Sequence, residues 1–539
     1  MINRFLRIIE YLSLPLLFAL YSVAFLAAHN INEVDFQDTG RAFAVIAFAV
    51  PVMVLLIWFF VRDGYRSALI AFMVVVLFFS YGHIRELMKS FAIMAPIFGR
   101  HRYLSVLFAS ILILWSWFVL KRIDSPQAWA RRISLVGVFA LILPIFTISS
   151  SYLPGEWETL QADPLDRDEI VISGDEMPDV YYIILDGYGR KDVLEELYSF
   201  DNSEFLMSLQ ERGFYVAEQS SSNYNTTRLS LASSLNLNYL QSIVELEGID
   251  LNPRTAEGMI WDNTVRRHLH EFGYKTVAFE TGRPWSSVDN ADHYLEARDD
   301  PEVDALLPRT TYLNLFEAML IKSTSFSLLI DSTKLIGAFE KAQSAITNEE
   351  HRIRIVYSMK KIQEIPRWPG NYFVFLHLLS PHPPFIFGAS GERIDHDRPF
   401  TYGDGNNFME IGSREDYIEG YIEQLQYINE LALNAVDTIL AESSIPPIII
   451  IQGDHGPGAY LEWQSIEDSN LTERQAILNA YYLPGKGTDG FYPSITPVNS
   501  FRLIFNAYFE GEYEMLEDRL FFTEKNGGYN LVEITGMVE

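Results

Sequence analysis

The first 150 residues of the chain consist of long apolar segments separated by short polar ones. A helix needs about 20 mostly apolar residues to cross about 30 Å of hydrocarbon. Five segments approach this length, and the third of them is the shortest. The pattern predicts a transmembrane domain over residues 1–153. Its expected helices cover residues 11–28, 42–61, 67–81, 103–120 and 133–153.

The first apolar segment is expected to be retained as a helix. No small-residue cleavage site precedes the acidic loop 32–38, and further apolar segments follow at once. With the N-terminus inside, the inner loops carry eight Lys and Arg residues and the outer loops five. This excess favours that orientation. Five spans then place the rest of the chain outside the cytoplasm, so we expect a multi-pass protein of the cell (plasma or inner) membrane with an extracytoplasmic catalytic domain.

The predicted spans contain almost no ionisable residues, and Glu10 lies only at a rim. Charged residues within the membrane mark substrate and ion pathways. The spans are therefore expected to serve as an anchor in the lipid bilayer rather than as a transporter.

A different pattern follows the membrane part. Residues 154–177 are polar and acidic without a sustained apolar period, which indicates a linker. Beyond it, short apolar runs alternate with segments of helical periodicity, as is typical of a doubly wound, mostly parallel sheet. We expect an α/β domain over residues 178–511 and a small C-terminal appendage over 512–539. The expected strands are 180–185, 276–279, 372–376 and 447–451, and the expected helices are 203–212, 264–272 and 417–442.

Charge divides the chain at the same boundary. Residues 1–150 contain 13 Lys and Arg against 7 Asp and Glu, whereas residues 151–539 contain 28 against 63. Binding a phosphate backbone requires clustered cations, so the acidic domain is not expected to bind nucleic acid. The chain has no cysteine, which excludes disulfides, zinc–thiolate sites and cysteine nucleophiles.

Two of the expected strands end in acidic residues. Asp186 follows the first strand, and Gly453-Asp454-His455-Gly456 follows the strand 447–451. Ligands of parallel sheets bind at the carboxyl ends of the strands. An adjacent Asp and His offer an oxygen and an imidazole to one cation, and the glycines let the backbone turn sharply. The alternative is a polar turn, which the position directly after a buried strand disfavours.

Two hydroxyl residues, Thr226 and Thr227, precede a helix that is rich in small residues and begins near Arg228. A helix N-terminus presents unpaired N–H groups and a partial positive charge, which suit an anionic tetrahedral group. The alternative is that Thr226 or Thr227 is only an N-cap. The residues alone leave both interpretations open.

Two histidines follow the strand 372–376. The segment Phe375-Leu-His377-Leu-Leu-Ser-Pro381-His382-Pro-Pro384-Phe385 is rich in proline, which forbids helix and stiffens extended backbone. The prolines are expected to hold His377 and His382 in a rigid loop beyond the strand. A single histidine would more often be structural, whereas two in one such loop at a sheet edge indicate a site.

In this order and spacing, the four elements resemble the alkaline phosphatase/sulfatase superfamily. The resemblance covers roughly residues 178–511 and includes the Gly-Tyr-x-Thr stretch at Gly273, the Pro-His-Pro loop and the Asp454-His455-Gly456 signature. In particular, the chain resembles membrane-anchored sulfatase-like proteins such as lipoteichoic acid synthases and lipid A phosphoethanolamine transferases. Those transferases also have five N-terminal membrane helices.

This resemblance implies an α/β sulfatase-like domain with one divalent metal ion (Mn, Zn, Mg or Ca). The implied ligands are Asp186, Thr227, Asp454 and His455, with Thr227 as the catalytic nucleophile. Thr227 is aligned rather than Thr226 because Ser230 then falls where the family motif has its serine. His377, His382 and Arg228 are expected to bind the substrate phosphoryl group.

The chain departs from true sulfatases, which oxidise a cysteine or serine to formylglycine. It has no cysteine and a threonine at the aligned position. The expected activity is therefore transfer or hydrolysis of a phosphoryl head group on a lipid or glycan substrate, through a phospho-threonine intermediate. Two alternatives remain: a sulfuric or phosphoric ester hydrolase with water as acceptor, and a non-catalytic membrane binding protein with a sulfatase-like fold.

Overall fold

The computed structural model describes residues 2–31, 36–91, 97, 99–151, 177–306, 314–331, 335–394, 401–485, 490–524 and 529–538. The chain divides into two compact units. The first comprises Met1–Leu153 and Arg309–Glu340, and the second comprises Pro154–Pro308 and Lys341–Glu539. Of the predicted linker, residues 154–177, all but Met177 lies outside the described residues.

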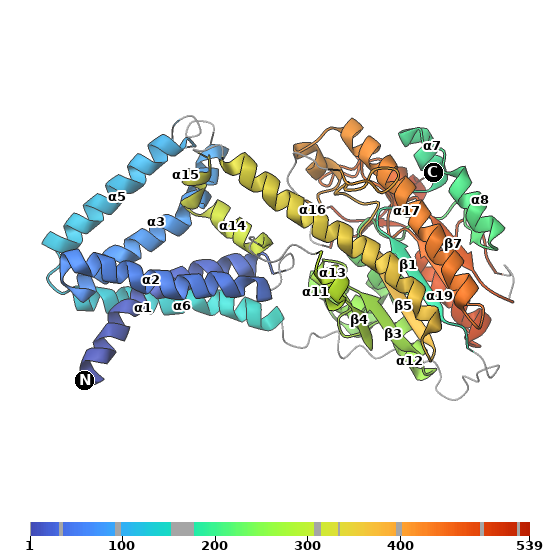
Figure 1. The fold of residues 1–539 in the computed structure, drawn as a ribbon, viewed down its shortest axis with the longest axis horizontal. Helices are drawn as coiled ribbons and strands as arrows, with labels where there is room; N and C mark the ends of the chain where they lie inside the picture. The colour runs from blue at the N-terminus through green and yellow to red at the C-terminus, as the bar shows by residue number, and fades with distance from the viewer. Residues whose placement is uncertain are drawn as a thin grey trace. The chain divides into compact units, whose positions relative to one another are not determined.

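Five helices of the first unit are long and apolar enough to cross a membrane, as the sequence predicted (Figure 1). The third predicted span was too short: it covers 27 residues rather than 67–81, because its last turns carry Arg85, Glu86 and Lys89 and fall outside the apolar pattern. The helices are α1 (Ile2–His29), α2 (Gly40–Val61), α3 (Gly64–Ser90), α5 (His101–Lys121) and α6 (Pro126–Ser151).

Many large apolar side chains of this unit face outward. Phe48, Leu55 and Phe60 on α2 are exposed, whereas the small Ala19 and Ala24 of α1 are buried between helices. In water such a surface would be costly, but it suits hydrocarbon. Small residues at the helix contacts let the backbones approach closely.

Two short helices from the middle of the chain also belong to the first unit. These are α14 (Leu315–Ser323) and α15 (Phe326–Asp331). The helix α16 (Leu335–Lys361) then begins in the first unit and continues into the second. The sequence pattern did not separate this segment from the predicted domain 178–511.

The second unit is built on a seven-stranded sheet with the order β2-β7-β6-β1-β5-β3-β4. The five strands from β6 to β4 are parallel to their neighbours, and β7 is antiparallel to β6 and β2, so the predicted mostly parallel sheet is confirmed. The strands are β1 (Val180–Leu185), β2 (Tyr215–Val216), β3 (Lys275–Phe279), β4 (His293–Leu295), β5 (Tyr372–Leu378), β6 (Ile448–Gln452) and β7 (Asn479–Tyr482).

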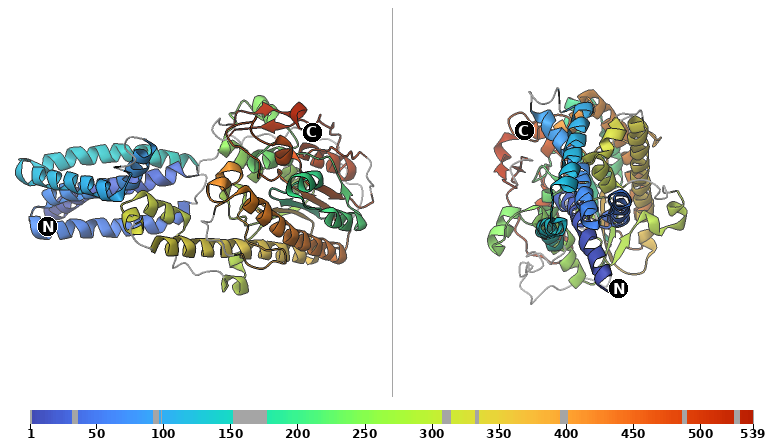
Figure 2. Two further views of the ribbon diagram at one scale, coloured as in Figure 1. Left: turned by 90° about the horizontal axis from the view of Figure 1, so that it is seen from above. Right: turned by 90° about the vertical axis from the view of Figure 1, so that its left-hand side faces the viewer.

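Helices cover both faces of this sheet. Alternate residues of β1 point to opposite sides, so that Tyr181 and Ile183 pack into one hydrophobic core and Val180 and Tyr182 into the other. The first core contains α7 (Lys191–Tyr198), α8 (Ser203–Glu211), α16 and α17 (Arg414–Glu442), and the last two can be followed in yellow and orange in Figures 1 and 2. The second core contains α9 (Thr227–Leu235), α10 (Leu240–Glu247), α11 (Pro253–Trp261), α12 (Thr264–Glu271) and α19 (Pro497–Tyr508).

The remaining elements are short. They are α13 (Pro301–Asp304), α18 (Leu471–Gln475), the strand pair β8 (Phe521–Phe522) and β9 (Val532–Glu533), and the 3₁₀ turns η1 (Phe36–Thr39), η3 (Pro284–Ser286), η4 (Ala297–Asp299), η5 (Ile362–Arg367), η6 (Gly405–Glu410) and η7 (Thr535–Met537). The pair β8–β9 lies within residues 512–539, and these residues belong to the second unit.

Candidate active site

The candidate residues gather where three parallel strands end. β1 lies between β6 and β5, with Leu185 opposite Leu378 and Ile184 opposite Gln452. The chain segments that follow the three strands therefore leave the sheet at the same edge, where ligands of such sheets bind.

The carboxylates of Asp186 and Asp454 are buried at this edge. The backbone N–H of Gly187 donates to Oδ1 of Asp454 at 3.0 Å. Oδ1 of Asp186 and Oδ2 of Asp454 have no hydrogen-bond donor among the described residues. Burial raises the pKa of Asp186, but His382, His377 and His455 outweigh it and hold the pKa below its ordinary value. A buried, ionised carboxylate without a donor is costly, so these oxygens require a positive partner.

His455 directs one ring nitrogen at both unsatisfied oxygens. Its Nδ1 lies 2.9 Å from the carbonyl oxygen of Gly456, which can only accept, so Nδ1 carries the hydrogen. Its Nε2 lies 3.5 Å from Oδ1 of Asp186 and 3.4 Å from Oδ2 of Asp454. Burial and the nearby Arg474 lower the pKa of His455, against the raising effect of the two carboxylates. The neutral ring thus presents a lone pair at Nε2.

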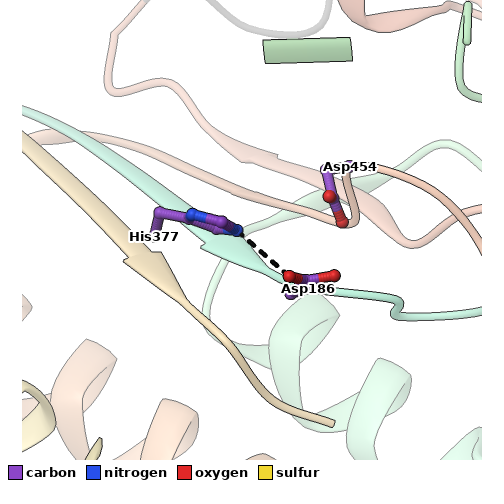
Figure 3. A group of neighbouring side chains, drawn as sticks. All are labelled: Asp186, His377 and Asp454. Atoms are coloured by element: carbon purple, nitrogen blue, oxygen red, sulfur yellow. Dashed lines mark ion pairs between the residues drawn. The ribbon is translucent and has the colours of Figure 1, made fainter. Parts of the chain in front are cut away.

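This donor set could hold a divalent cation. Two carboxylate oxygens and an imidazole nitrogen face one another without a proton between them, which is unfavourable unless a cation lies among them. Asp186, Asp454 and His377 also offer one ligand atom each within 4.8 Å of one another (Figure 3). The residues present therefore fit a metal ion of the oxygen- and nitrogen-binding class.

Thr226 and Thr227 have different surroundings. Thr226 occupies the N-cap position of α9, but its side chain makes no capping hydrogen bond, and its Oγ1 is buried without a partner in the described part of the chain. Thr227 is the first helical residue, and its hydroxyl lies 3.1 Å from Nε2 of His455. Because Nδ1 of His455 carries the hydrogen, the Thr227 hydroxyl donates to Nε2. The structure thus brings Thr227, and not Thr226, to the carboxylate cluster.

The segment before Thr226 is held by the C-terminal residues. The backbone N–H of Phe521 in β8 donates to the carbonyl oxygen of Asn223 at 2.8 Å. The Asn225 side chain exchanges hydrogen bonds of 2.9 and 3.0 Å with the backbone of Thr523. Residues 519–523 thereby fix the direction from which the chain enters α9.

His377 does not lie in the proline-rich loop, and this part of the prediction was wrong. It is a residue of β5, because the strand continues to Leu378, opposite Leu185, and the prolines begin only at Pro381. The His377 side chain is buried, with Nε2 at 3.4 Å from Oδ2 of Asp186 (Figure 3). His377 therefore lies beside the second carboxylate oxygen of Asp186, and neither of its ring nitrogens has a hydrogen-bond partner among the described residues.

His382 lies in the loop as expected, beside the same cluster. Its Nδ1 is 2.7 Å from the carbonyl oxygen of Pro383, and its Nε2 is 3.6 Å from Oδ2 of Asp404. Its ring centre is 6.0 Å from that of His455. The ring is thus pinned at one nitrogen and faces a carboxylate with the other.

Arg228 lies in the first turn of α9, directly after Thr227. Its guanidinium forms an ion pair of 3.0 Å with Glu257 and lies over the ring of Trp285, 4.8 Å from the centroid. The Trp285 ring is in turn 6.3 Å from that of His377. Arg228 is therefore near the cluster, but a carboxylate already engages it.

Sequence reasoning missed Asp404 and Arg474. Oδ2 of Asp404 accepts from Nη1 of Arg474 at 2.6 Å, and the hydroxyl of Tyr417 donates to Oδ1 at 2.7 Å. Burial raises the pKa of Asp404, but Arg474 and His382 outweigh it and bring the pKa to about 2. Neither residue belongs to a motif, and 70 positions separate them, so no local signal could have found the pair.

No family model and no curated protein sequence matches this chain. Among solved structures, it is similar to the C-terminal periplasmic domain of EcEptC from Escherichia coli in complex with Zn, at 12% identity and a TM-score of 0.41, covering 68% of this chain and 94% of that one. It is similar to the integral membrane protein lipooligosaccharide phosphoethanolamine transferase A from Neisseria meningitidis, at 13% identity and a TM-score of 0.36, covering 93% and 95%. The lipoteichoic acid synthase LtaP from Listeria monocytogenes matches at 12% identity and a TM-score of 0.37, covering 66% and 81%.

Proposed function

We propose that this chain is a membrane-anchored, metal-dependent enzyme that transfers or hydrolyses a phosphoryl head group through Thr227. One observation carries the proposal. Two buried carboxylate oxygens without donors, the lone pair of His455 and the hydroxyl of Thr227 converge where β1 and β6 end.

In this proposal Asp186, Thr227, Asp454 and His455 hold one divalent cation (Mn, Zn, Mg or Ca). Such an ion supplies Lewis acidity, which lowers the pKa of a bound hydroxyl and offsets negative charge on a phosphoryl group. His377 keeps Asp186 in place through its second carboxylate oxygen. One of its ring nitrogens also lies within 4.8 Å of a carboxylate oxygen of Asp454, so His377 is a candidate for a further ligand.

Thr227 is placed to act as the nucleophile. As the first residue of α9, it lies among unpaired backbone N–H groups, and the N-terminal end of the helix dipole favours an anionic phosphoryl group there. Its Oγ forms a bond to phosphorus while the bond from phosphorus to the leaving oxygen breaks. The threonine proton passes to water, and the phosphoryl group remains as an ester on Thr227.

The leaving alcohol needs a proton, and His382 is the better placed of the two histidines to give it. It lies in a loop beside the cluster, whereas His377 is buried within a strand. Its Nε2 faces the carboxylate of Asp404, and Arg474 keeps Asp404 ionised. A second alcohol, or water, then attacks the phospho-threonine and releases Thr227. The same first step therefore serves transfer and hydrolysis.

The five apolar helices support a substrate that resides at a membrane, such as a lipid or lipid-linked glycan head group. We propose that the catalytic residues lie outside the cytoplasm, as the distribution of Lys and Arg among the loops favours. The acidic composition of the second unit gives no support to a nucleic-acid partner.

Metal content tests the proposal directly. The full chain in detergent should contain one divalent ion, and Asp454→Asn and His455→Ala should each weaken binding by more than about 100-fold. Asp179→Asn is the matched control, because Asp179 is half-buried at the other end of β1, where its carboxylate accepts from the N–H of Tyr372. Equal metal content in the wild type and in all three variants would refute the assigned ligands.

Substrate comparison separates the chemical alternatives. An aryl phosphodiester should be cleaved, and an aryl sulfate should react far more slowly. Stimulation by added alcohols, with formation of the alcohol ester, would indicate transfer. A metal-loaded protein without any turnover on phosphodiesters or lipids would favour the non-catalytic alternative.

A further inference from the structure

The segment Arg309–Glu340 interrupts the second unit and belongs to the first. The chain leaves the second unit after Pro308 and returns to it at Lys341. Between these points, α14 and α15 pack against the membrane helices. Their contacts lie at one end of the bundle, because a single hydrophobic cluster joins Phe316 to Leu26 at the end of α1, Ala42 at the start of α2 and Ile148 near the end of α6.

The contact between the start of α14 and the start of α2 is polar. Asn314 and Glu317 form a capping box at the start of α14. Oε2 of Glu317 accepts from Nη2 of Arg41 at 2.8 Å, and Nδ2 of Asn314 donates to the carbonyl oxygen of Asp38 at 2.7 Å. The start of α14 is thereby attached to the polar residues where α2 begins.

The turn between the two helices contacts α3. The backbone N–H of Ser325 donates to the carbonyl oxygen of Phe78 at 2.8 Å, and the rings of Phe78 and Phe326 are 5.1 Å apart. Gly82 makes this approach possible: a Cβ there would lie 2.6 Å from the carbonyl oxygen of Ser323. The turn is therefore fitted to α3 at a position where only glycine leaves room.

The position of Phe78 along α3 indicates how deep in the membrane the turn between α14 and α15 lies. The charged residues Arg85, Glu86 and Lys89 occupy the last turns of α3. Phe78 precedes Arg85 by seven residues, which is about 10 Å along a helix axis. With 9 and 6 residues, α14 and α15 are too short to cross the hydrocarbon. Apolar Phe316, Met319 and Leu320 nevertheless pack against the spans.

We propose that residues 314–331 form a re-entrant hairpin that enters the membrane and leaves it on the same side, with acyl chains of the lipid covering Phe326. This side chain is 48% exposed, whereas Phe316 in the same segment is buried against the spans.

The chain has no native cysteine, so an introduced cysteine is labelled without competition from another thiol. Phe326→Cys in the full chain is labelled with a fluorescent maleimide and reconstituted in vesicles of phosphatidylethanolamine and phosphatidylglycerol. Leu306→Cys is the aqueous control, because Leu306 is 70% exposed in the second unit, and Val45→Cys on α2, 64% exposed, is the lipid control. Aqueous iodide and spin-labelled lipid are the two quenchers.

The label at position 326 should behave like that at 45, with at least about fivefold less quenching by iodide than at 306 and clear quenching by spin-labelled lipid. Equal iodide quenching at 326 and 306 would overturn the proposal. Gly82→Leu should raise iodide access at 326 toward that at 306. Gly40→Leu is the matched control, since no atom lies within 4 Å of a Cβ there. If the label at position 326 is quenched by lipid but its access to iodide is unchanged in Gly82→Leu, the proposed docking on α3 is wrong.

Discussion

Adjacent threonines show how a one-residue step changes chemistry. Thr226 and Thr227 are neighbours, but Thr226 is the extended N-cap of α9 and Thr227 is its first helical residue. The Thr227 hydroxyl faces His455, and that of Thr226 is buried without a hydrogen bond in the described residues. Only one of the two hydroxyls can therefore meet a phosphoryl group at the carboxylate cluster.

Thr227→Ala should lower turnover of an aryl phosphodiester by about 10³-fold or more, because the nucleophile is lost. Mass spectrometry of the peptide around residue 227 should no longer detect a phosphoryl adduct after incubation with membrane lipids. Thr226→Ala should retain activity and lose at most about 1 kcal/mol of stability, since its hydroxyl forms no cap bond. The reverse result would shift the assigned nucleophile by one residue.

Glu473 is a buried carboxyl group close to the site. The hydroxyl of Tyr198 donates to one oxygen and the N–H of Tyr460 to the other. Burial raises its pKa to about 7, against the lowering effect of these two donors. The folded state thus keeps a proton that the unfolded chain releases at about pH 4.5.

The unfolding free energy should therefore fall as pH rises from about 5 to about 7, by at most about 1.4 kcal/mol per pH unit for one proton. The contribution of Glu473 is fully present below the unfolded pKa and lost above the folded one. Glu473→Gln should remove that part of the slope in denaturant titrations at each pH. The same substitution at exposed Glu430 should leave the slope unchanged, and parallel curves for wild type and Glu473→Gln would contradict the assignment.

At the level of elements, the turn after β6 depends on close backbone approach. Gly456 follows the Asp-His pair, and a Cβ there would lie 1.9 Å from the carbonyl oxygen of Glu473. The backbone N–H of Gly456 also donates to the carbonyl oxygen of Arg474 at 2.8 Å. The short helix α18 thereby fixes the direction in which Asp454 and His455 leave the strand.

Gly456→Ala should force α18 and the turn apart, destabilise the protein by about 2 kcal/mol or more, and weaken metal binding. Gly536→Ala is a suitable comparison, because a Cβ at Gly536 meets no atom within 4 Å. Thermal unfolding and metal titration of both variants measure the two effects. Normal metal affinity in Gly456→Ala would show that the turn does not set the geometry of the pair.

The elements that the sequence predicted are those with a long, uniform pattern. The strands β1, β3, β5 and β6 are buried on both faces and appear as apolar runs, and α8, α12 and α17 have a clear helical period. The strands β2, β4 and β7 have two to four residues and were missed. Such short strands are defined by pairing with neighbours, which no local pattern records.

The candidate site divides in the same way. Asp186, Asp454 and His455 could be found because they directly follow predicted strands. Asp404 and Arg474 could not, because an irregular segment and a five-residue helix carry them and only tertiary packing joins them. His377 was displaced from its predicted loop because sheet pairing extends β5 to Leu378, close to the first proline.

On the scale of the whole molecule, the orientation of the spans remains a prediction. A phosphatase reporter fused after residue 539 should be active outside the cytoplasm, because five spans separate the two ends of the chain. A green fluorescent protein that is exported unfolded fluoresces only when it stays in the cytoplasm. Fused at the same position, it should therefore be dark. An inactive phosphatase together with a fluorescent green fluorescent protein would show that the orientation is the reverse of the predicted one.

The attachment of α14 and α15 to the first unit has a practical consequence for soluble fragments. A fragment that starts at Met177 would retain these helices without the spans that cover Phe316, Met319 and Leu320. Those side chains would then meet water, and the fragment would be expected to self-associate or bind detergent. Replacing residues 309–334 by a short glycine–serine linker should yield a monodisperse fragment that retains the carboxylate cluster. Truncation at the linker alone would cut the chain at only one of the three places where it passes between the two units.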